Sequence, residues 1–172
     1  MNDWSEDEEE SIIRNLYNIG LAHANRGKPR EAIFYFEQIL KVEPTHVGAL
    51  VNKGNALGKL GRYEEAILSY EVVLARMPTH STSLLNKGLA LHYLLRYDEA
   101  ISCYNTVLVR DPGNPAALYQ KACSCVLKNQ PDESLALLER VVKIDPAYAS
   151  KASRDDDFLS LRDDSRFKAI TT

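Results

Sequence analysis

The amino-acid sequence predicts an all-α protein built from antiparallel helix hairpins stacked side by side, and three observations lead to this prediction. Prolines recur at intervals of 34 residues through most of the chain. Small residues and aromatic residues recur at the same interval. Within each interval, apolar residues three and four positions apart form two blocks, which is the pattern of two amphipathic helices. A fixed period of this size indicates a repeat architecture.

Four columns of residues define the repeat. They are Pro44, Pro78, Pro112 and Pro146; Gly20, Gly54, Gly88 and Ala122; Ala32, Ala66, Ala100 and Ser134; and Phe36, Tyr70, Tyr104 and Leu138. This register predicts four repeats, over residues 13–46, 47–80, 81–114 and 115–148. A single hairpin cannot bury both of its apolar stripes, so consecutive repeats are expected to stack and share one core.

Each hairpin needs two helices in close contact and a tight turn between them. Gly54 and Ala66 are expected to face one another across the second hairpin, where overpacking would cost about 1–3 kcal/mol. The first helix of each repeat is expected to end at a left-handed residue, which favours glycine or asparagine. The residues in this column are Gly27, Gly61, Leu95 and Asn129. A left-handed leucine costs roughly 1–2 kcal/mol, so the third turn is either strained or built differently.

Residues 1–12 are interpreted as an acidic N-terminal extension of the first helix. Ser5 and Glu8 match a capping box, so this helix is expected to start near Glu6. The acidic residues that follow suit the positive end of a helix dipole. A solvated helix start explains them more simply than a docking tail does, and the role of Trp4 stays open.

Residues 149–172 leave the 34-residue register but keep apolar residues such as Phe158 and Phe167. Terminal repeats need a face that covers the last apolar stripe while staying soluble, so this segment is interpreted as short capping helices. Two acidic pairs lie here, Asp155 with Asp156 and Asp163 with Asp164. Helix N-caps explain these pairs more simply than a metal or acid/base cluster does.

The segments that carry the repeat resemble the tetratricopeptide repeat (TPR) family. They read LYNIGLAHANRGKPREAIFYFEQILKVEP, LVNKGNALGKLGRYEEAILSYEVVLARMP, LLNKGLALHYLLRYDEAISCYNTVLVRDP and LYQKACSCVLKNQPDESLALLERVVKIDP, and the C-terminal segment is similar to the endings that often follow such arrays. The resemblance implies a right-handed α-solenoid whose first helices line a concave surface. It also implies a non-catalytic adaptor or scaffold that holds a peptide segment of a partner protein there.

The same resemblance identifies the side chains that would face a peptide in this concave groove. They are Tyr17, Leu21 and Asn25 in the first repeat; Val51, Asn52, Asn55 and Lys59 in the second; Leu85, Asn86, Leu89 and Tyr93 in the third; and Tyr119, Gln120 and Cys123 in the fourth.

The groove column has a chemistry of its own. Asn52, Asn86 and Gln120 are carboxamides 34 residues apart, and a carboxamide both donates and accepts, so a row of them suits a peptide backbone. The tyrosines of the set can bury ligand side chains and keep a polar tip, which favours a protein or peptide partner with apolar or aromatic residues. An alternative remains for Leu85 and Leu89, which would then only help neighbouring helices to pack.

One specificity known in the family is not expected. Chaperone-binding members grip a C-terminal carboxylate with two lysines, an arginine and two asparagines. The matching positions are Tyr17, Leu21, Asn52, Thr82 and Asn86 over the first three repeats, and Val51, Asn55, Asn86, Ala116 and Gln120 over the last three. No cation stands at these positions, so a carboxylate would lack charge-assisted bonds worth roughly 1.5–3 kcal/mol each.

Composition disfavours several other classes of partner. A net charge of −3 with scattered Lys and Arg residues makes nucleic acid a poor candidate. No apolar run approaches the roughly 20 residues that span a bilayer, so no membrane partner is expected. The acidic start does not match a secretory signal, and we expect a cytoplasmic protein.

No set of residues supports catalysis. Of the histidines, His23 is expected in the core, His46 and His80 in turns, and only His92 in the groove. The three cysteines, which include Cys123, lack metal-site spacing, so free thiols are expected and neither a metal nor a cofactor is. We therefore expect no enzyme.

A hypothesis of a different class remains open. The chain is then a structural module that assembles with itself into a homo-oligomer, through its ends or through its convex face. The convex residues in question are Phe34, Tyr35, Leu68 and Val72.

Overall fold

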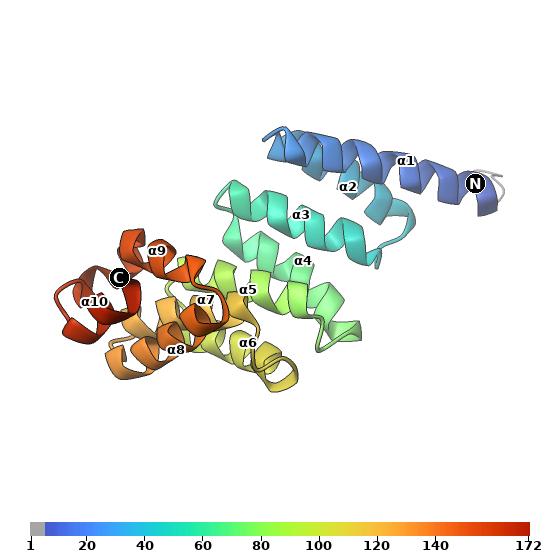
Figure 1. The fold of residues 1–172 in the computed structure, drawn as a ribbon. Coiled ribbons are helices and arrows are strands. Elements are labelled where there is room, and N and C mark those ends of the chain that lie inside the picture. The colour runs from blue at the N-terminus through green and yellow to red at the C-terminus, as the bar shows by residue number, and fades with distance from the viewer. Residues whose placement is uncertain (1–5) are drawn as a thin grey trace. The chain divides into compact units, whose positions relative to one another are not determined.

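The computed structural model describes residues 6–172, and every regular element in that range is helical, which confirms the all-α prediction. The elements are α1 (Glu6–Asn25), α2 (Pro29–Val42), α3 (Val47–Lys59), α4 (Tyr63–Arg76), α5 (Ser81–Tyr93), α6 (Tyr97–Arg110), α7 (Pro115–Leu127), α8 (Pro131–Ile144), α9 (Ala147–Arg154), the 3₁₀ helix η1 (Asp156–Leu161) and α10 (Ser165–Thr171) (Figure 1). Helix α1 begins at Glu6, as expected. Trp4 and Ser5, and with them the expected capping box, lie outside the described residues.

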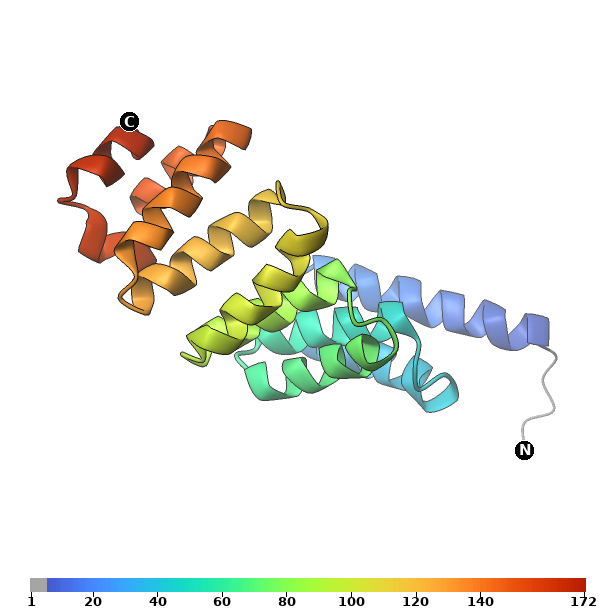
Figure 2. The ribbon, with the colours of Figure 1, turned by 90° about the horizontal axis from the view of Figure 1, so that it is seen from below.

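The chain forms two compact units, one up to Ser83 and one from Leu84 to Thr172. In the first unit, α1 packs against α2 and α3 against α4, while α2 and α1 each contact α3. In the second unit, α7 packs against both α6 and α8. The C-terminal elements cover this second unit, because η1 lies on α7 and α10 lies against α8 and α9 (Figure 2).

One contact recurs inside the hairpins, where an aromatic ring of the second helix lies directly on a glycine of the first. A Cβ atom added to the glycine would come within 2.7 Å of the ring for Gly20 and Phe36, and within 2.5 Å for Gly54 and Tyr70 and for Gly88 and Tyr104. The atoms nearest to such a Cβ atom on Gly54 thus belong to Tyr70. In the fourth repeat the smaller Leu138 replaces the ring, and alanine replaces glycine.

The four hairpin turns share one backbone geometry. Gly27, Gly61, Leu95 and Asn129 all have positive φ, from 61° to 74°. In each turn the N–H of the next residue donates to the carbonyl five positions back, as Arg96 does to Leu91 at 2.9 Å, which is the Schellman pattern. The third turn is thus built like the others, and its leucine is strained. Leu95 is 71% exposed, so little packing offsets that strain.

Histidines cap two of the helices that open a repeat. The Nδ1 atom of His46 accepts a hydrogen bond from the backbone N–H of Ala49 at 3.0 Å, and His80 does the same for Ser83 at 3.3 Å. Asn114, in the same column, caps α7 through Ala117. These histidines lie in the inter-repeat turns, as expected, but histidine is not among the preferred N-cap residues, so the sequence did not indicate this role.

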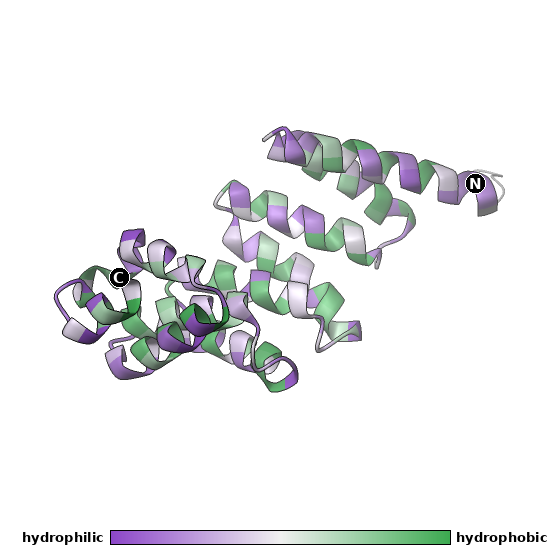
Figure 3. Ribbon diagram, in the orientation of Figure 1, coloured by the Kyte–Doolittle hydropathy of each residue, from purple (hydrophilic) through white to green (hydrophobic). Residues whose placement is uncertain are grey.

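The helices interleave hydrophobic and hydrophilic residues along their length (Figure 3). Across residues 6–172, no helix combines the length and the apolar character that crossing a membrane requires.

Two buried tyrosines in the aromatic column differ in one hydrogen bond. The hydroxyl of Tyr70 donates to Oδ1 of Asn55 at 2.9 Å. The hydroxyl of Tyr104 is buried and has no hydrogen-bond partner among the described residues. The alignment of the repeats explains this difference, because Leu89 occupies the position of Asn55 in the third repeat and offers no acceptor.

This difference predicts opposite effects for the same substitution. Tyr70→Phe should lower the free energy of unfolding by about 1–2 kcal/mol, because it breaks the bond to Asn55. Tyr104→Phe should leave it unchanged or raise it by up to about 1 kcal/mol, because it removes a desolvated hydroxyl that bonds to nothing. Urea unfolding followed by circular dichroism measures both variants. Equal losses in the two would contradict the assignment.

Candidate functional site

In the first unit, Tyr17 of α1 and Asn52 of α3 form a polar pair. Nδ2 of Asn52 donates to the Tyr17 hydroxyl oxygen at 2.9 Å and also to the carbonyl of Gly48 at 2.9 Å. A Cβ atom on Gly48 would meet the Tyr17 hydroxyl at 2.9 Å, so the missing side chain lets the ring approach the start of α3. Both side chains are half-buried.

This pair leaves one donor and one acceptor unused. Both hydrogen bonds of the Asn52 carboxamide use its nitrogen, and its Oδ1 atom accepts none from the described part of the chain. The Tyr17 oxygen accepts from Asn52, but its own proton has no acceptor among the described residues. A hydroxyl donor and a carboxamide acceptor therefore lie side by side, and they complement the C=O and N–H groups of a peptide backbone.

The other predicted groove residues of the first unit differ in exposure. Val51 is 8% exposed and belongs to a core cluster, so it is closed to a ligand. Leu21 is half-buried and packs on the core beneath it. Asn55 is half-buried and accepts from a tyrosine of α4, so it supports the hairpin. Asn25 and Lys59 are exposed at the C-terminal ends of α1 and α3.

In the second unit, the chain's own C-terminal segment covers two of the predicted groove residues. Tyr119 and Cys123 are each 1% exposed. The Tyr119 hydroxyl donates to Oδ2 of Asp155 at 2.7 Å, and its ring centre lies 5.9 Å from that of Phe158. The ammonium of Lys151 lies 4.1 Å from the centre of the Tyr119 ring. Tyr119 and Cys123 therefore contact the protein itself and are closed to a ligand, contrary to the expectation.

The remaining predicted residues of the second unit are at least partly exposed. Tyr93 is 55% exposed, and its ring meets His92 edge to face. Leu85, Asn86, Leu89 and Gln120 are half-buried. Their contact with a ligand stays a prediction.

A second cluster of polar groups lies under this C-terminal segment. His92 is 6% exposed, so it does not face an open groove as expected. Its Nδ1 atom lies 2.9 Å from the Ser124 hydroxyl, and its Nε2 atom lies 3.2 Å from Oδ2 of Asp157. One ligand atom each from Cys123, Asp155 and Asp157 lie within 4.8 Å of one another. Burial, the carboxylates of both aspartates and a hydrogen bond to Asp157 raise the pKa of the Cys123 thiol.

The sequence indicated only part of this arrangement. Asp155 accepts from the backbone N–H of Asp157 at 3.1 Å at the start of η1, and Asp164 accepts from that of Arg166 at 2.7 Å at the start of α10. The N-cap interpretation is therefore confirmed for these two aspartates. Because the segment lies outside the 34-residue register, the sequence did not indicate that it folds back onto α7 and brings Asp155 close to Cys123.

Comparison with known proteins places the chain among helical repeat proteins. The family model for the tetratricopeptide repeat matches residues 17–81 and 85–149. A solved structure of MamA from Desulfovibrio magneticus RS-1, residue 41 to the end, has a TM-score of 0.79 at 22% identity and covers 92% of this chain and 89% of that one. The TPR protein TTC0263 from Thermus thermophilus has a TM-score of 0.75 at 20% identity, with coverages of 92% and 87%.

A third similar structure holds a ligand. The second TPR domain of human RPAP3, in complex with the HSP70 peptide SGPTIEEVD, has a TM-score of 0.64 at 22% identity and covers 67% of this chain and 97% of that one. No curated protein matches the sequence.

Proposed function

This chain belongs to the tetratricopeptide repeat family, and we propose that it is a non-catalytic protein–protein interaction module that binds an extended peptide segment of a partner protein. The proposed contact face in the first unit consists of α1 and α3. We place the module in the cytoplasm, as an adaptor or scaffold.

The observation that carries the proposal is the unused hydrogen-bonding capacity of Tyr17 and Asn52. The Tyr17 O–H would donate to a ligand carbonyl, and Oδ1 of Asn52 would accept from a ligand N–H. Because the two groups are already joined by a hydrogen bond and half-buried, their geometry is set before the ligand arrives, which lowers the entropic cost of binding.

The side chains around this pair support a preference for apolar or aromatic ligand residues. Leu21 and the ring of Tyr17 are half-buried and give an apolar surface beside the polar pair. In the second unit, we propose further contacts through Leu85, Asn86, Leu89, Tyr93 and Gln120. The RPAP3 domain shows that this fold can present a peptide site, while the residues that recognise the ligand are particular to each chain.

The polar pair can be tested with peptides selected from a random displayed library against the wild-type chain. Asn52→Ala and Tyr17→Phe should each weaken the dissociation constant of a selected peptide roughly 5–30-fold, since a lost hydrogen bond of about 1–2 kcal/mol corresponds to that range. Titration calorimetry measures the affinities, and circular dichroism checks that the helices persist.

Asn105→Ala serves as the matched control, because Asn105 is an exposed asparagine on α6 and outside the proposed face. It should bind the selected peptides like the wild type. Peptides that bind the Asn52→Ala and Tyr17→Phe variants as tightly as the wild type would remove the basis of the proposal.

The chain should not bind the chaperone tail held by the RPAP3 domain. The peptide SGPTIEEVD ends in acidic residues and a carboxylate, whereas the matching positions here carry tyrosine, leucine, asparagine and threonine in the first three repeats. Calorimetry with this peptide and a scrambled version should show equally weak heats. Tight, sequence-dependent binding of the unscrambled peptide would show that a carboxylate clamp exists after all.

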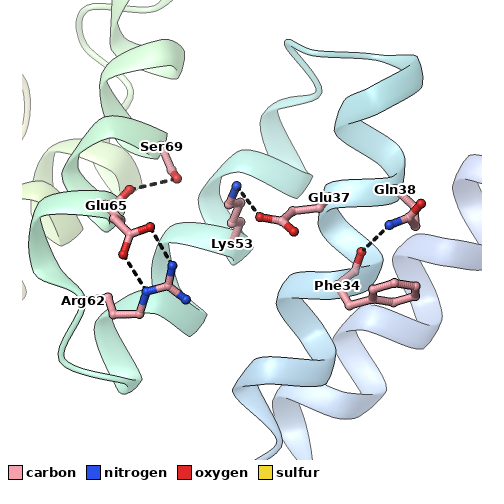
Figure 4. A network of polar contacts seen from close by, with 7 residues as sticks. All are labelled: Phe34, Glu37, Gln38, Lys53, Arg62, Glu65 and Ser69. Carbon is pink, nitrogen blue, oxygen red and sulfur yellow. Dashed lines mark hydrogen bonds and ion pairs between the residues drawn. The ribbon is translucent and has the colours of Figure 1, made fainter.

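A second candidate function is self-assembly, and exposed apolar side chains on the second helices favour it. Phe34 is 56% exposed and Leu68 is 62% exposed. Leu68 and Val72 line a shallow hollow together with Lys53 and Glu65. Lys53 and Glu65 each form an ion pair. Lys53 pairs with Glu37 of α2 at 2.8 Å, and Glu65 pairs with Arg62, which precedes α4, at 2.6 Å (Figure 4). An apolar floor with a charged rim suits a protein interface.

Light scattering over a range of concentrations tests this candidate. If the face joins two copies, the molar mass should rise with concentration for the wild type and stay at that of a monomer for the double variant Phe34→Ser with Leu68→Ser. Val109→Ser is the control, because Val109 is 82% exposed on α6. A constant monomer mass for the wild type would exclude self-assembly through this face.

A further inference from the structure

The cluster under the C-terminal segment gathers side chains of three different ligand types. His92 comes from α5, Cys123 from α7, Asp155 from the turn after α9, and Asp157 from η1. All four belong to the second compact unit. We propose that His92, Cys123, Asp155 and Asp157 form a binding site for Zn²⁺ that fastens the C-terminal segment to α5 and α7.

The spacing of the ligand atoms is close to what zinc requires. The Cys123 sulfur and one oxygen from each aspartate lie within 4.8 Å of one another. An ion among them would lie within about 2.8 Å of each atom, against zinc bond lengths of about 2.0–2.3 Å, so shifts of less than about 1 Å bring these three atoms to bonding distance. Nε2 of His92 lies 3.2 Å from Oδ2 of Asp157 but outside this group of three, and it would have to move towards the ion to serve as the fourth ligand.

Residues behind these ligands hold them in position. The fully buried Ser124 hydroxyl lies 2.9 Å from Nδ1 of His92, which leaves Nε2 directed at Asp157. The Tyr119 hydroxyl donates to Asp155 at 2.7 Å. A histidine whose second ring nitrogen is bonded, and a carboxylate that accepts from a buried hydroxyl, are the supports that metal ligands usually have.

The mixture of donor atoms selects the ion. A thiolate is a soft ligand that Mg²⁺ and Ca²⁺ do not favour, whereas Zn²⁺ accepts sulfur, imidazole nitrogen and carboxylate oxygen in one tetrahedral shell. On binding, the Cys123 thiol loses its proton to solvent and a sulfur–zinc bond forms, with no change of oxidation state. The two carboxylates would share the cation with the thiolate.

The consequence is a clip that closes the end of the second unit. Asp155 and Asp157 flank the start of η1, and the adjacent Phe158 is fully buried in the core cluster. An ion held jointly by α5, α7 and this segment would resist the opening of that cluster, and so would stabilise the folded second unit.

Titration of the full chain with Co²⁺, followed by displacement with Zn²⁺, tests the site. Tetrahedral Co²⁺ absorbs in the visible range, and a cobalt–thiolate bond adds a charge-transfer band in the near ultraviolet. The wild type should take up one Co²⁺ per chain with both features, and Zn²⁺ should bleach them. Zn²⁺, but not Mg²⁺, should also raise the unfolding temperature.

Matched variants locate the ion. Cys123→Ser should abolish the charge-transfer band, whereas Cys125→Ser should keep it, because Cys125 is equally buried on α7 but outside the cluster. Asp157→Asn should weaken Co²⁺ binding at least tenfold, whereas Asp156→Asn, which alters the exposed neighbour, should not. The near-isosteric Asp157→Asn keeps the test decisive if Cys123→Ser fails to fold.

Three results would each overturn the proposal. The first is a wild-type titration without the thiolate band. The second is a band that survives Cys123→Ser or disappears in Cys125→Ser. The third is equal Co²⁺ affinity in the Asp157→Asn and Asp156→Asn variants, which would mean that any bound ion sits elsewhere on the surface.

Discussion

The hairpins of this protein depend on the contact between an aromatic ring and a glycine. The rings of Phe36, Tyr70 and Tyr104 lie where a Cβ atom on the facing glycine would overlap them. The distance between the two helices is therefore set by the thickness of an aromatic ring that packs directly on the backbone of a glycine. In the fourth repeat both members change together, since leucine stands in the aromatic column and alanine in the glycine column. The pair behaves as a unit, because a larger residue on one side requires a smaller one on the other.

Given this contact and the left-handed residue in each hairpin turn, the repeat tolerates residues that are locally unfavourable. Leu95 adopts the same left-handed conformation as the glycines of the other turns, although its side chain gains little burial in return. Tyr104 keeps the buried ring that the hairpin needs, although its hydroxyl bonds to nothing in the described chain. In both places the geometry shared by all repeats overrides the preference of a single residue, which is the expected behaviour where tertiary packing supplies most of the stability.

The period, the hairpins and the turn positions could all be predicted from the sequence, because each is a column property that recurs every 34 residues. The approach of Asp157 to His92 could not, since the C-terminal segment has left the register and its partners lie on helices far away in the sequence. The pairing of Tyr17 with Asn52 was equally hidden, because it joins two different columns and depends on the missing side chain of Gly48. The groove residues inferred from the family resemblance alone included Tyr119, whose hydroxyl instead donates to Asp155 of the same chain.

The segment that covers Tyr119 is tethered, and this changes the competition for that surface. Only the eight-residue α9 and its short flanks separate Asp155 from the end of α8, so the segment meets α7 at an effective concentration on the order of millimolar or above. A separate molecule that offers the same contacts would have to displace a segment that is covalently linked to the unit. The displacement would also expose the buried ring of Phe158. The surface around Tyr119 and Cys123 in the second unit is therefore kept for an intramolecular contact, whereas Tyr17 and Asn52 in the first unit are only half-buried.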